Sequence, residues 1–279
     1  MTTPIQQQPL EAKSPFELRV NLGKGVPESD VRSALATGDM GFLHSFTTGA
    51  TVDGPGVRVV AWTAGCMWRC LYCHNPDTWT MSNGIPVTVV RAAEELRKYR
   101  QGLKVMSGGL TISGGEPLMQ HRFVVKLFRA AKQMGVHTAL DTNGYYGEKL
   151  SDDDLEAIDL VLLDIKAWDS ERHRHLTGMD NAPTFEFARR LAARKRKVWV
   201  RYVLVPDLTD DPADIKQTAA FVSGLGNVER VDVLPFHQMG QYKWEKLGIP
   251  YTLKDGKSPT NELVARTIGI YKSEGLVTY

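Results

Sequence analysis

The sequence predicts an α/β fold built from parallel strands that alternate with helices. Short apolar runs rich in β-branched residues are each followed by a longer amphipathic stretch. This alternation is typical of a parallel sheet that helices cover on both faces. Six such units are present, at roughly 25–40 residues per repeat, whereas a closed barrel of this kind has eight. The 279 residues are enough for one large domain with a single core.

The predicted elements follow one another from about residue 41 onward. The expected strands, each a run of apolar and β-branched residues, are 57–63, 110–113, 138–140, 160–165, 198–205 and 231–234. The expected helices, each with an amphipathic pattern, are 87–99, 122–134, 152–158, 183–194, 212–224 and 260–273. Every expected strand is therefore followed by an expected helix.

The first forty residues differ in composition from the rest. Residues 1–15 are rich in Thr, Gln and Pro, and residues 26–38 are polar, with room for at most one short helix beginning near Ser29. We therefore expect residues 1–40 to form a partly disordered extension and residues 41–279 to form the folded domain.

Composition argues against several classes of function. Lys and Arg number 34 against 32 Asp and Glu, so the net charge gives no electrostatic reason to expect a nucleic acid partner. No apolar stretch approaches the length of a membrane span, and residues 1–13 lack the basic start and apolar core of a secretory signal. We expect a soluble, cytoplasmic protein.

Cys66, Cys70 and Cys73 are the only cysteines, and all three lie in one short run. Thiolates are soft ligands that bind iron–sulfur clusters and zinc, and the C-x3-C-x2-C spacing brings three of them together. A cubane cluster needs four ligands. Three thiolates without a fourth cysteine would leave one iron with an open position for a small molecule.

Two other uses of the cysteines are open. Three cysteines with His74 form an accepted donor set for structural zinc. However, His74 directly follows Cys73, so its ring tends to point away from a metal bound by its neighbour. The paired C-x2-C knuckles of such zinc sites are also absent. An odd number of cysteines in a chain without a secretory signal argues against a disulfide framework.

Polar motifs follow five of the six expected strands. The cysteine run comes after the first, and the others are 114–117, 141–144, 164–166 and 235–237. The carboxyl ends of the strands in such folds meet at one rim, where active sites form. The sequence therefore predicts a single site at this rim.

Two of these motifs have a direct physical interpretation. Gly114 and Gly115 remove side chains so that backbone can approach a ligand closely, although a plain tight turn explains them too. Asp164 and Lys166 are two apart on a strand and share its inner face, while Ile165 points toward the helices. Charged side chains on an inner face are costly unless they are paired or ligated.

The cysteine spacing, with Tyr72 before the last cysteine, resembles that of the radical S-adenosylmethionine enzymes. The match extends to residues 51–58, Thr-Val-Asp-Gly-Pro-Gly-Val-Arg, and to residues 65–79, which end in Cys-His-Asn-Pro-Asp-Thr-Trp. These motifs resemble the family of pyruvate formate-lyase-activating enzymes, and the likeness runs from about Gly41 to the C-terminus. The resemblance implies an open partial (β/α)6 barrel.

The resemblance also implies cofactors. It implies a [4Fe–4S] cluster on Cys66, Cys70 and Cys73, with S-adenosylmethionine at the open iron. The residues that it assigns to S-adenosylmethionine are Tyr72, Cys73, His74, Gly115, Asp164, Ile165, Lys166 and His237. It assigns a monovalent cation to Asp141, Thr142, Asp164 and the backbone of Leu162, although an aspartate that caps a loop explains Asp141 nearly as well. Asp53 and Arg201 match residues near the substrate peptide of the family.

The implied activity is the activation of pyruvate formate-lyase. Reductive cleavage of S-adenosylmethionine would give a 5′-deoxyadenosyl radical, which would remove an α-hydrogen from one glycine of that partner. The implied partners include a flavodoxin- or ferredoxin-type electron donor, and the chain is expected to be a monomer.

Three alternatives remain. Activases of other glycyl radical enzymes commonly carry an insert with further cysteines, which this chain lacks. A non-catalytic protein with a structural or sensing cluster would not need Gly115, Lys166 or His237. A zinc-stabilised hydrolase would be colourless, whereas an iron–sulfur protein purified without oxygen is brown.

Overall fold

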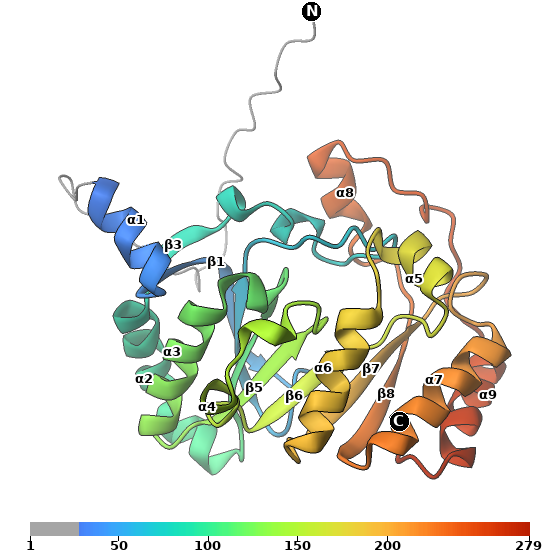
Figure 1. The fold of residues 1–279 in the computed structure, drawn as a ribbon. Helices are drawn as coiled ribbons and strands as arrows, with labels where there is room; N and C mark the ends of the chain where they lie inside the picture. Colours follow the sequence, from blue (N-terminus) through green and yellow to red (C-terminus); the bar gives the residue numbers. More distant parts are fainter. Residues whose placement is uncertain (1–27) are drawn as a thin grey trace, which may run out of the picture.

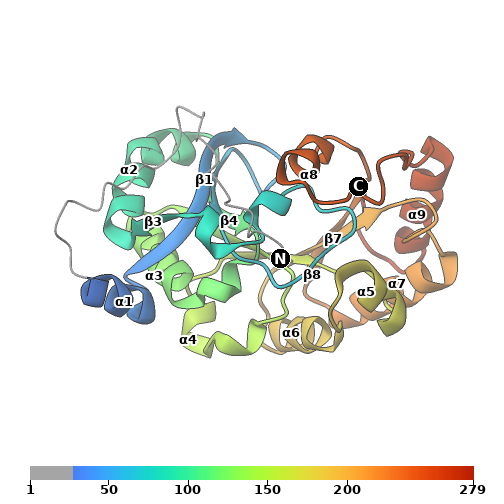
Figure 2. The same ribbon diagram turned by 90° about the horizontal axis from the view of Figure 1, so that it is seen from above.

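The computed structural model describes residues 28–279, which form one curved, open sheet with helices along its outer side (Figures 1 and 2). Most of the extension predicted for residues 1–40 lies outside the described residues. In the described part the sheet has eight strands, in the order β3-β1-β2-β4-β5-β6-β7-β8. Their bounds are β1 (Met40–Ala50), β2 (Arg58–Thr63), β3 (Ile85–Thr88), β4 (Gly109–Gly114), β5 (His137–Thr142), β6 (Leu160–Asp164), β7 (Val198–Leu204) and β8 (Val228–Pro235).

The six strands expected from the sequence are all present, as β2 and β4 to β8, and neighbours among them pair in parallel. The sheet has two more strands than the sequence predicts, because β1 pairs antiparallel with both β2 and β3. The second half of β1 is polar and β3 has only four residues, so neither forms an apolar run. β3 and β8 lie at opposite ends of the strand order, which leaves the barrel open.

The six expected helices are present with shifted ends, and α5 and α8 are additional. The helix bounds are α1 (Glu28–Thr37), α2 (Val89–Val105), α3 (His121–Gln133), α4 (Asp152–Leu155), α5 (Ser170–Thr177), α6 (Ala182–Ala193), α7 (Pro212–Leu225), α8 (Gln241–Leu247) and α9 (Asn261–Ser273). Short 3-10 turns are η1 (Pro76–Thr78), η2 (Met81–Asn83), η3 (Pro117–Gln120) and η4 (Gly147–Lys149). α5 and α8 are short and polar, so they lack the apolar stripe that identified the others.

Several helices begin at a residue whose side chain accepts a backbone hydrogen bond. Thr88, Ser151 and Asp169 cap α2, α4 and α5 in this way. These caps supply partners for N–H groups in the first turn that the helix itself leaves unpaired. The caps thus help to fix where these three helices start.

The main core lies between the outer face of the sheet and the helices. Side chains alternate between the faces of a strand, so Leu110 and Ile112 of β4 pack in this core whereas Thr111 and Ser113 point to the inner face. Phe128 of α3 belongs to the same buried cluster. The inner face is therefore polar enough to carry a site, while the outer face stabilises the fold.

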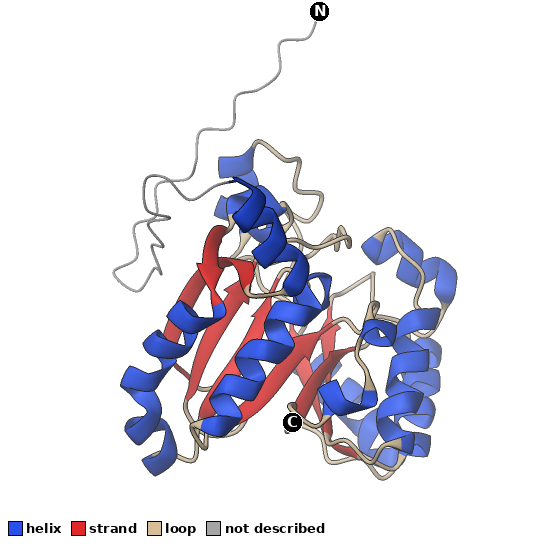
Figure 3. Cartoon of the chain, turned by 60° about the vertical axis from the view of Figure 1, so that its left-hand side comes forward, coloured by secondary structure: helices blue, strands red, loops and turns tan. Residues whose placement is uncertain are grey.

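The carboxyl ends of the parallel strands meet at the upper end of the molecule, where the cysteine loop, residues 64–79, crosses them (Figure 1). The short helices α5 and α8 lie beside this loop, while the longer helices cover the outside of the strands (Figure 3). None of the helices that the structure describes combines the length and apolar character needed to cross a bilayer.

Candidate active site

A cavity of about 550 Å³ opens at the carboxyl ends of the strands. It brings together most of the predicted site residues: Asp53, Cys66, Cys70, Tyr72, Cys73, His74, Gly115, Asp141, Thr142, Asp164, Lys166, Arg201 and His237. Leu162 and Ile165 do not line it, because their side chains are buried in hydrophobic clusters. Any role for these two in the cavity would fall to their backbone atoms.

Backbone hydrogen bonds hold the cysteine loop over the cavity. At its start, the N–H of Gly65 donates to the carbonyl of Thr78 at 2.7 Å, and the N–H of Cys66 donates to the carbonyl of Trp79 at 3.0 Å. Gly65 has a φ of +93°, a conformation that favours glycine. Cys73 N–H donates to the Cys70 carbonyl at 3.1 Å. The loop thus closes on itself and turns its three thiols toward one cavity.

The three thiols line one cavity and are a suitable donor set for an iron–sulfur cluster. All three cysteines are unpaired by disulfides. Within residues 28–279, no three His, Cys, Asp or Glu side chains are grouped tightly enough to hold one metal ion. A cubane contains several irons and is wider than one ion, so its ligands need not converge on a point. Burial raises the pKa of Cys66 and Cys73, and that of Cys70 to about 12, which favours the neutral thiols while no cationic group is bound.

Gly114 and Gly115 allow two backbone segments to meet. A Cβ on Gly115 would lie 2.3 Å from the carbonyl oxygen of Gly65, and one on Gly114 would lie 2.3 Å from the nitrogen of Thr63. Gly114 also has a φ of +119°. The structure therefore supports close packing against the start of the cysteine loop as one reason for these glycines, while Gly115 also lines the cavity.

Glu116 links the loops that follow β4 and β5. One carboxylate oxygen accepts from the Thr142 hydroxyl at 2.7 Å and from Leu118 N–H at 2.8 Å, and the other accepts from Asn143 N–H at 2.9 Å. The side chain is completely buried. Burial raises the pKa of Glu116 to about 7, although the three donors act to lower it. Glu116 lies in the predicted motif 114–117, but no pattern in the sequence indicates that its side chain is buried and joins two loops.

Lys166 and Asp164 form the predicted pair on the inner face. The ammonium lies 3.0 Å from a carboxylate oxygen of Asp164 and 5.6 Å from the ring centre of Tyr72. Burial, the largest single effect, lowers the pKa of Lys166, but the charge and hydrogen bond of Asp164, together with the charge of Cys70, raise the pKa above its ordinary value. Lys166 is therefore a fixed positive charge in the wall of the cavity.

Arg201 and Asp141 form a second ion pair on this wall. Their Nη1 and Oδ2 atoms are 2.8 Å apart, and the hydroxyl of Ser113 donates to the same oxygen at 2.6 Å. Burial, followed by the nearby charge of Asp141, raises the pKa of Asp53. The monovalent cation assigned to Asp141 and Thr142 stays a prediction, because these side chains bond to Arg201, Ser113 and Glu116.

His74 and His237 meet at the mouth of the cavity. Their ring centres are 4.2 Å apart, and Nε2 of His74 lies 3.2 Å from the carbonyl oxygen of His237. Burial, and then the neighbouring ring of His237, lower the pKa of His74. The neutral form of His74 is thus favoured near neutral pH. His173 does not line the cavity; it is buried, and its Nδ1 lies 2.9 Å from the carbonyl oxygen of Met179.

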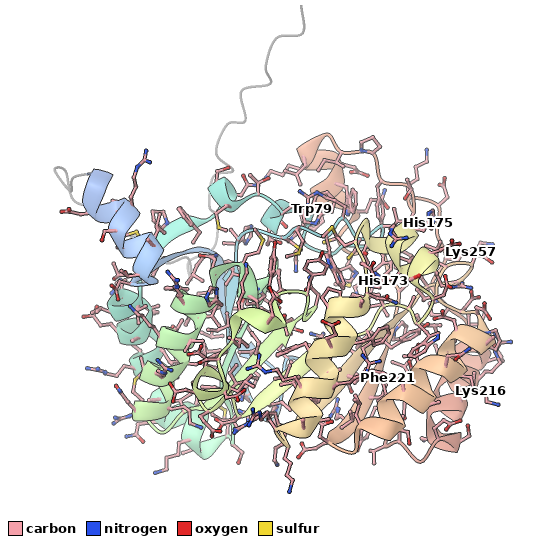
Figure 4. All side chains as sticks on the ribbon, viewed as in Figure 1. Trp79, His173, His175, Lys216, Phe221 and Lys257 are labelled. Atoms are coloured by element: carbon pink, nitrogen blue, oxygen red, sulfur yellow. The ribbon has the colours of Figure 1, made fainter. Side chains whose placement is uncertain are left out.

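Two site neighbours escaped the sequence analysis. Lys243 and Trp244 belong to α8, about 170 residues after the cysteines, yet they bond to residues 73, 75 and 77. Trp79 lies at the upper end of the molecule near α8, whereas Lys216 and Phe221 lie on the outer helix α7 (Figure 4). Only the fold reveals this proximity, because α8 carries no motif.

Comparisons with known proteins agree with this geometry. A model of the radical SAM superfamily matches residues 60–222. The chain is 43% identical over 238 residues to the pyruvate formate-lyase 1-activating enzyme of Escherichia coli strain K12, covering 85% of this chain and 97% of that protein. It is 44% identical over 231 residues to the pyruvate formate-lyase-activating enzyme of Staphylococcus epidermidis, covering 80% and 92% respectively.

Solved structures share the fold. A domain of a pyruvate-formate lyase-activating enzyme from Bacteroides vulgatus matches with a TM-score of 0.51 at 24% identity, covering 62% of this chain and 98% of that one. Streptococcus suis SuiB bound to its precursor peptide SuiA matches with a TM-score of 0.58 at 17% identity, covering 90% and 52%. With the sequence identities above, the chain belongs to the pyruvate formate-lyase-activating enzymes of the radical SAM superfamily.

Proposed function

We propose that this chain activates a pyruvate formate-lyase by removing an α-hydrogen from one of its glycines. The observation that carries the proposal is the placement of three free thiols and the buried ammonium of Lys166 on one cavity. The chain is also similar, over nearly their whole length, to proteins named for that activity. A structural or sensing cluster would not need the charged pairs Lys166–Asp164 and Arg201–Asp141 in the same cavity.

The residues present fit a [4Fe–4S] cluster with S-adenosylmethionine. Cys66, Cys70 and Cys73 would hold the cluster, and the open side of the cavity leaves room for a ligand at the remaining iron. When bound, the two groups supply one-electron reductive cleavage of the sulfonium and abstraction of a hydrogen atom. The protein's own side chains would then bind S-adenosylmethionine, orient the substrate peptide and keep water away from the reacting atoms.

Lys166 would hold the carboxylate of S-adenosylmethionine. Its ammonium is fixed by Asp164 and supported by the face of Tyr72, so the positive charge stays in place without ordering a flexible side chain. Gly115 would present backbone to the methionyl amino group. His74 and His237, whose rings meet at a tilt at the mouth of the cavity, would contact the remaining part of the molecule. Ile165 contributes through its backbone, since its side chain is buried.

Asp53 and Arg201 would receive the glycine-bearing segment of the partner. Both line the same cavity as the cysteines, and they offer one acceptor and one donor group to an extended backbone. A glycine suits this place because it has no side chain to hinder the approach. Buried aromatic side chains such as Trp68 and Phe236 would keep water away from the reacting carbon.

The other roles of the chain follow from this activity. We propose that it works as a monomer in the cytoplasm and takes its electron from a flavodoxin- or ferredoxin-type protein. We also propose that residues 41–279 are the catalytic domain and that residues 1–40 are an extension, of which residues 28–37 form α1.

The test is a radical assay without oxygen. The chain is loaded with iron and sulfide, reduced, and mixed with S-adenosylmethionine and a pyruvate formate-lyase. We expect a glycine-centred doublet in the electron paramagnetic resonance spectrum of the lyase. Normal cleavage of S-adenosylmethionine with no doublet on this lyase, but with a doublet on another glycyl radical enzyme, would overturn the choice of partner. Colourless protein with stoichiometric zinc would overturn the chemistry as well.

A further inference from the structure

The segment after β8 folds back over the second half of the cysteine loop. Residues 236–258, here called the α8 segment, are closed on themselves by Gln238, whose side-chain amide donates to the carbonyls of Leu253, Lys254 and Gly256 at 2.7 to 2.9 Å. A Cβ on Gly240 would lie only 2.9 Å from Cα of His74. The backbone of this segment therefore packs directly on the residue that follows the third cysteine.

Trp244 fastens this segment to Cys73 itself. Its indole N–H donates to the backbone carbonyl of Cys73 at 2.9 Å. The ring, which is 5% exposed, packs edge-on against Trp79 at 5.1 Å and lies beside Tyr251 at 4.9 Å. The bond is thus shielded from water and fixes one orientation of the peptide group that bears the third thiol.

Lys243 makes a second connection one residue earlier in α8. Its ammonium donates to the side-chain oxygen of Asn75 at 2.9 Å and lies 3.0 Å from a carboxylate oxygen of Asp77. His44 of β1 contacts the same carboxylate at 3.2 Å. The Lys243 and Asp77 side chains are only 19% and 11% exposed, so this ion pair is screened less than a surface pair.

The two halves of the cysteine loop are held by different elements. The first half bonds to α5, through Arg69 N–H to the carbonyl of Thr177 at 2.7 Å and Leu71 N–H to that of Leu176 at 3.0 Å. The second half, from Cys73 to Asp77, meets α8 through Lys243 and Trp244. Partners outside a metal's direct ligands orient those ligands and tune the site.

We propose that Lys243 and Trp244 are positioning residues for the third cluster ligand. They fix the backbone position of Cys73 and of the residues that follow it, and a segment about 170 residues away thereby governs cluster retention. This inference rests on the proposed function only in taking the three thiols as cluster ligands. Neither residue is assigned to S-adenosylmethionine or to the substrate peptide.

The test uses the full chain with its reconstituted cluster and measures how fast iron is lost to a chelator. Trp244→Phe keeps an aromatic ring and removes the donor to Cys73, and Lys243→Met keeps the apolar stem and removes the charge. We expect iron loss about fivefold faster in Trp244→Phe, the factor for one neutral hydrogen bond, and about tenfold or more in Lys243→Met. We also expect altered resonance positions for the reduced cluster.

Matched variants separate positioning from general stability. Trp199→Phe removes an indole bond to Glu229, distant from the loop, and Lys246→Met changes an exposed lysine of the same helix. Both should release iron at the parent rate, and Lys243→Arg should restore most of the retention. Parent-like release and spectra in both Lys243→Met and Trp244→Phe would overturn the inference. Failure of the unsubstituted, fully loaded chain in the radical assay would instead overturn the proposed function.

Discussion

Each of the three cysteines has its own place in the cysteine loop, so the loss of one cannot be replaced by another. The described chain offers no fourth cysteine; Cys70 and Cys73 are the two ends of one hydrogen-bonded turn, and Cys66 is bonded to Trp79 at the other end of the loop. We expect the parent chain to bind about four irons, and Cys70→Ala to lose the [4Fe–4S] absorption and its resonance signal. Iron analysis after anaerobic reconstitution checks this, and full cluster content in Cys70→Ala would contradict it.

Lys166 is the residue from which we expect the largest single contribution to S-adenosylmethionine binding. Loss of a hydrogen bond to a charged group costs about 1.5–3 kcal/mol, so Lys166→Ala should raise the Kd by about ten- to a hundredfold. The cluster should stay intact, because no cysteine is touched. Anaerobic calorimetric titration measures the change. Lys216→Ala, on the outer helix α7, is the control and should bind as the parent does (Figure 4).

At the residue scale, the sequence predicts which residues line the site but not which side chains they contact. The spacing of the cysteines and the positions of Asp164 and Lys166 after a strand are local features, so thirteen of the fifteen predicted residues line the cavity. The pairing of Arg201 with Asp141, and of Ser113 with the same oxygen, joins three different strands. No local pattern could show which carboxylate Arg201 meets.

Between elements, Glu116 ties the loop after β4 to the end of β5 and the loop that follows it by two hydrogen bonds, from Thr142 and Asn143. Its pKa is about 7 in the folded chain, where burial raises it, against an ordinary value of 4.5. Between these two pH values the unfolded chain loses this proton while the folded chain keeps it. The contribution of Glu116 to the free energy of unfolding should therefore fall by about 3 kcal/mol as pH rises from 4.5 to 7, and level off above.

Denaturant unfolding of the cluster-free chain at several pH values tests this. Glu116→Gln cannot ionise, so the stability of this variant relative to the parent should rise across the same window. The amide of glutamine cannot accept from Asn143 N–H, which should cost about 1–3 kcal/mol at low pH. Glu148→Gln, at an exposed position, is the control. A parent-to-variant difference that does not change with pH would refute a raised pKa at Glu116.

Across the whole molecule, the sequence predicts the repeated strand–helix units and the rim where their loops meet. The strands and helices of these units are identified by the spacing of apolar residues within each segment, which can be read locally from the sequence. The antiparallel strands β1 and β3 and the short helices α5 and α8 could not be predicted in the same way. They are held by pairing and contact with distant segments, as where the α8 segment covers the cysteine loop. The α8 segment, which packs on the cysteine loop, is thus a part of the site that the sequence does not predict.

The last prediction concerns how the open side of the barrel binds the glycine-bearing segment of the partner. Arg201 lies on the same wall as Lys166 but is assigned to the peptide, so its loss should uncouple the two substrates. We expect Arg201→Ala to cleave S-adenosylmethionine at nearly the parent rate, yet to form about tenfold fewer glycyl radicals per molecule cleaved, the factor for one charged hydrogen bond.

Deuterium at the α-carbon of the target glycine makes this coupling measurable. In the parent chain the label should appear in 5′-deoxyadenosine, and in Arg201→Ala most of that product should be unlabelled. Arg201→Lys keeps the charge but not the planar donor pair, so it should restore coupling only in part. Arg194→Ala, at the residue directly after the outer helix α6, should leave labelling unchanged. Equal labelling in the parent and Arg201→Ala would remove Arg201 from the peptide site and leave it a structural partner of Asp141.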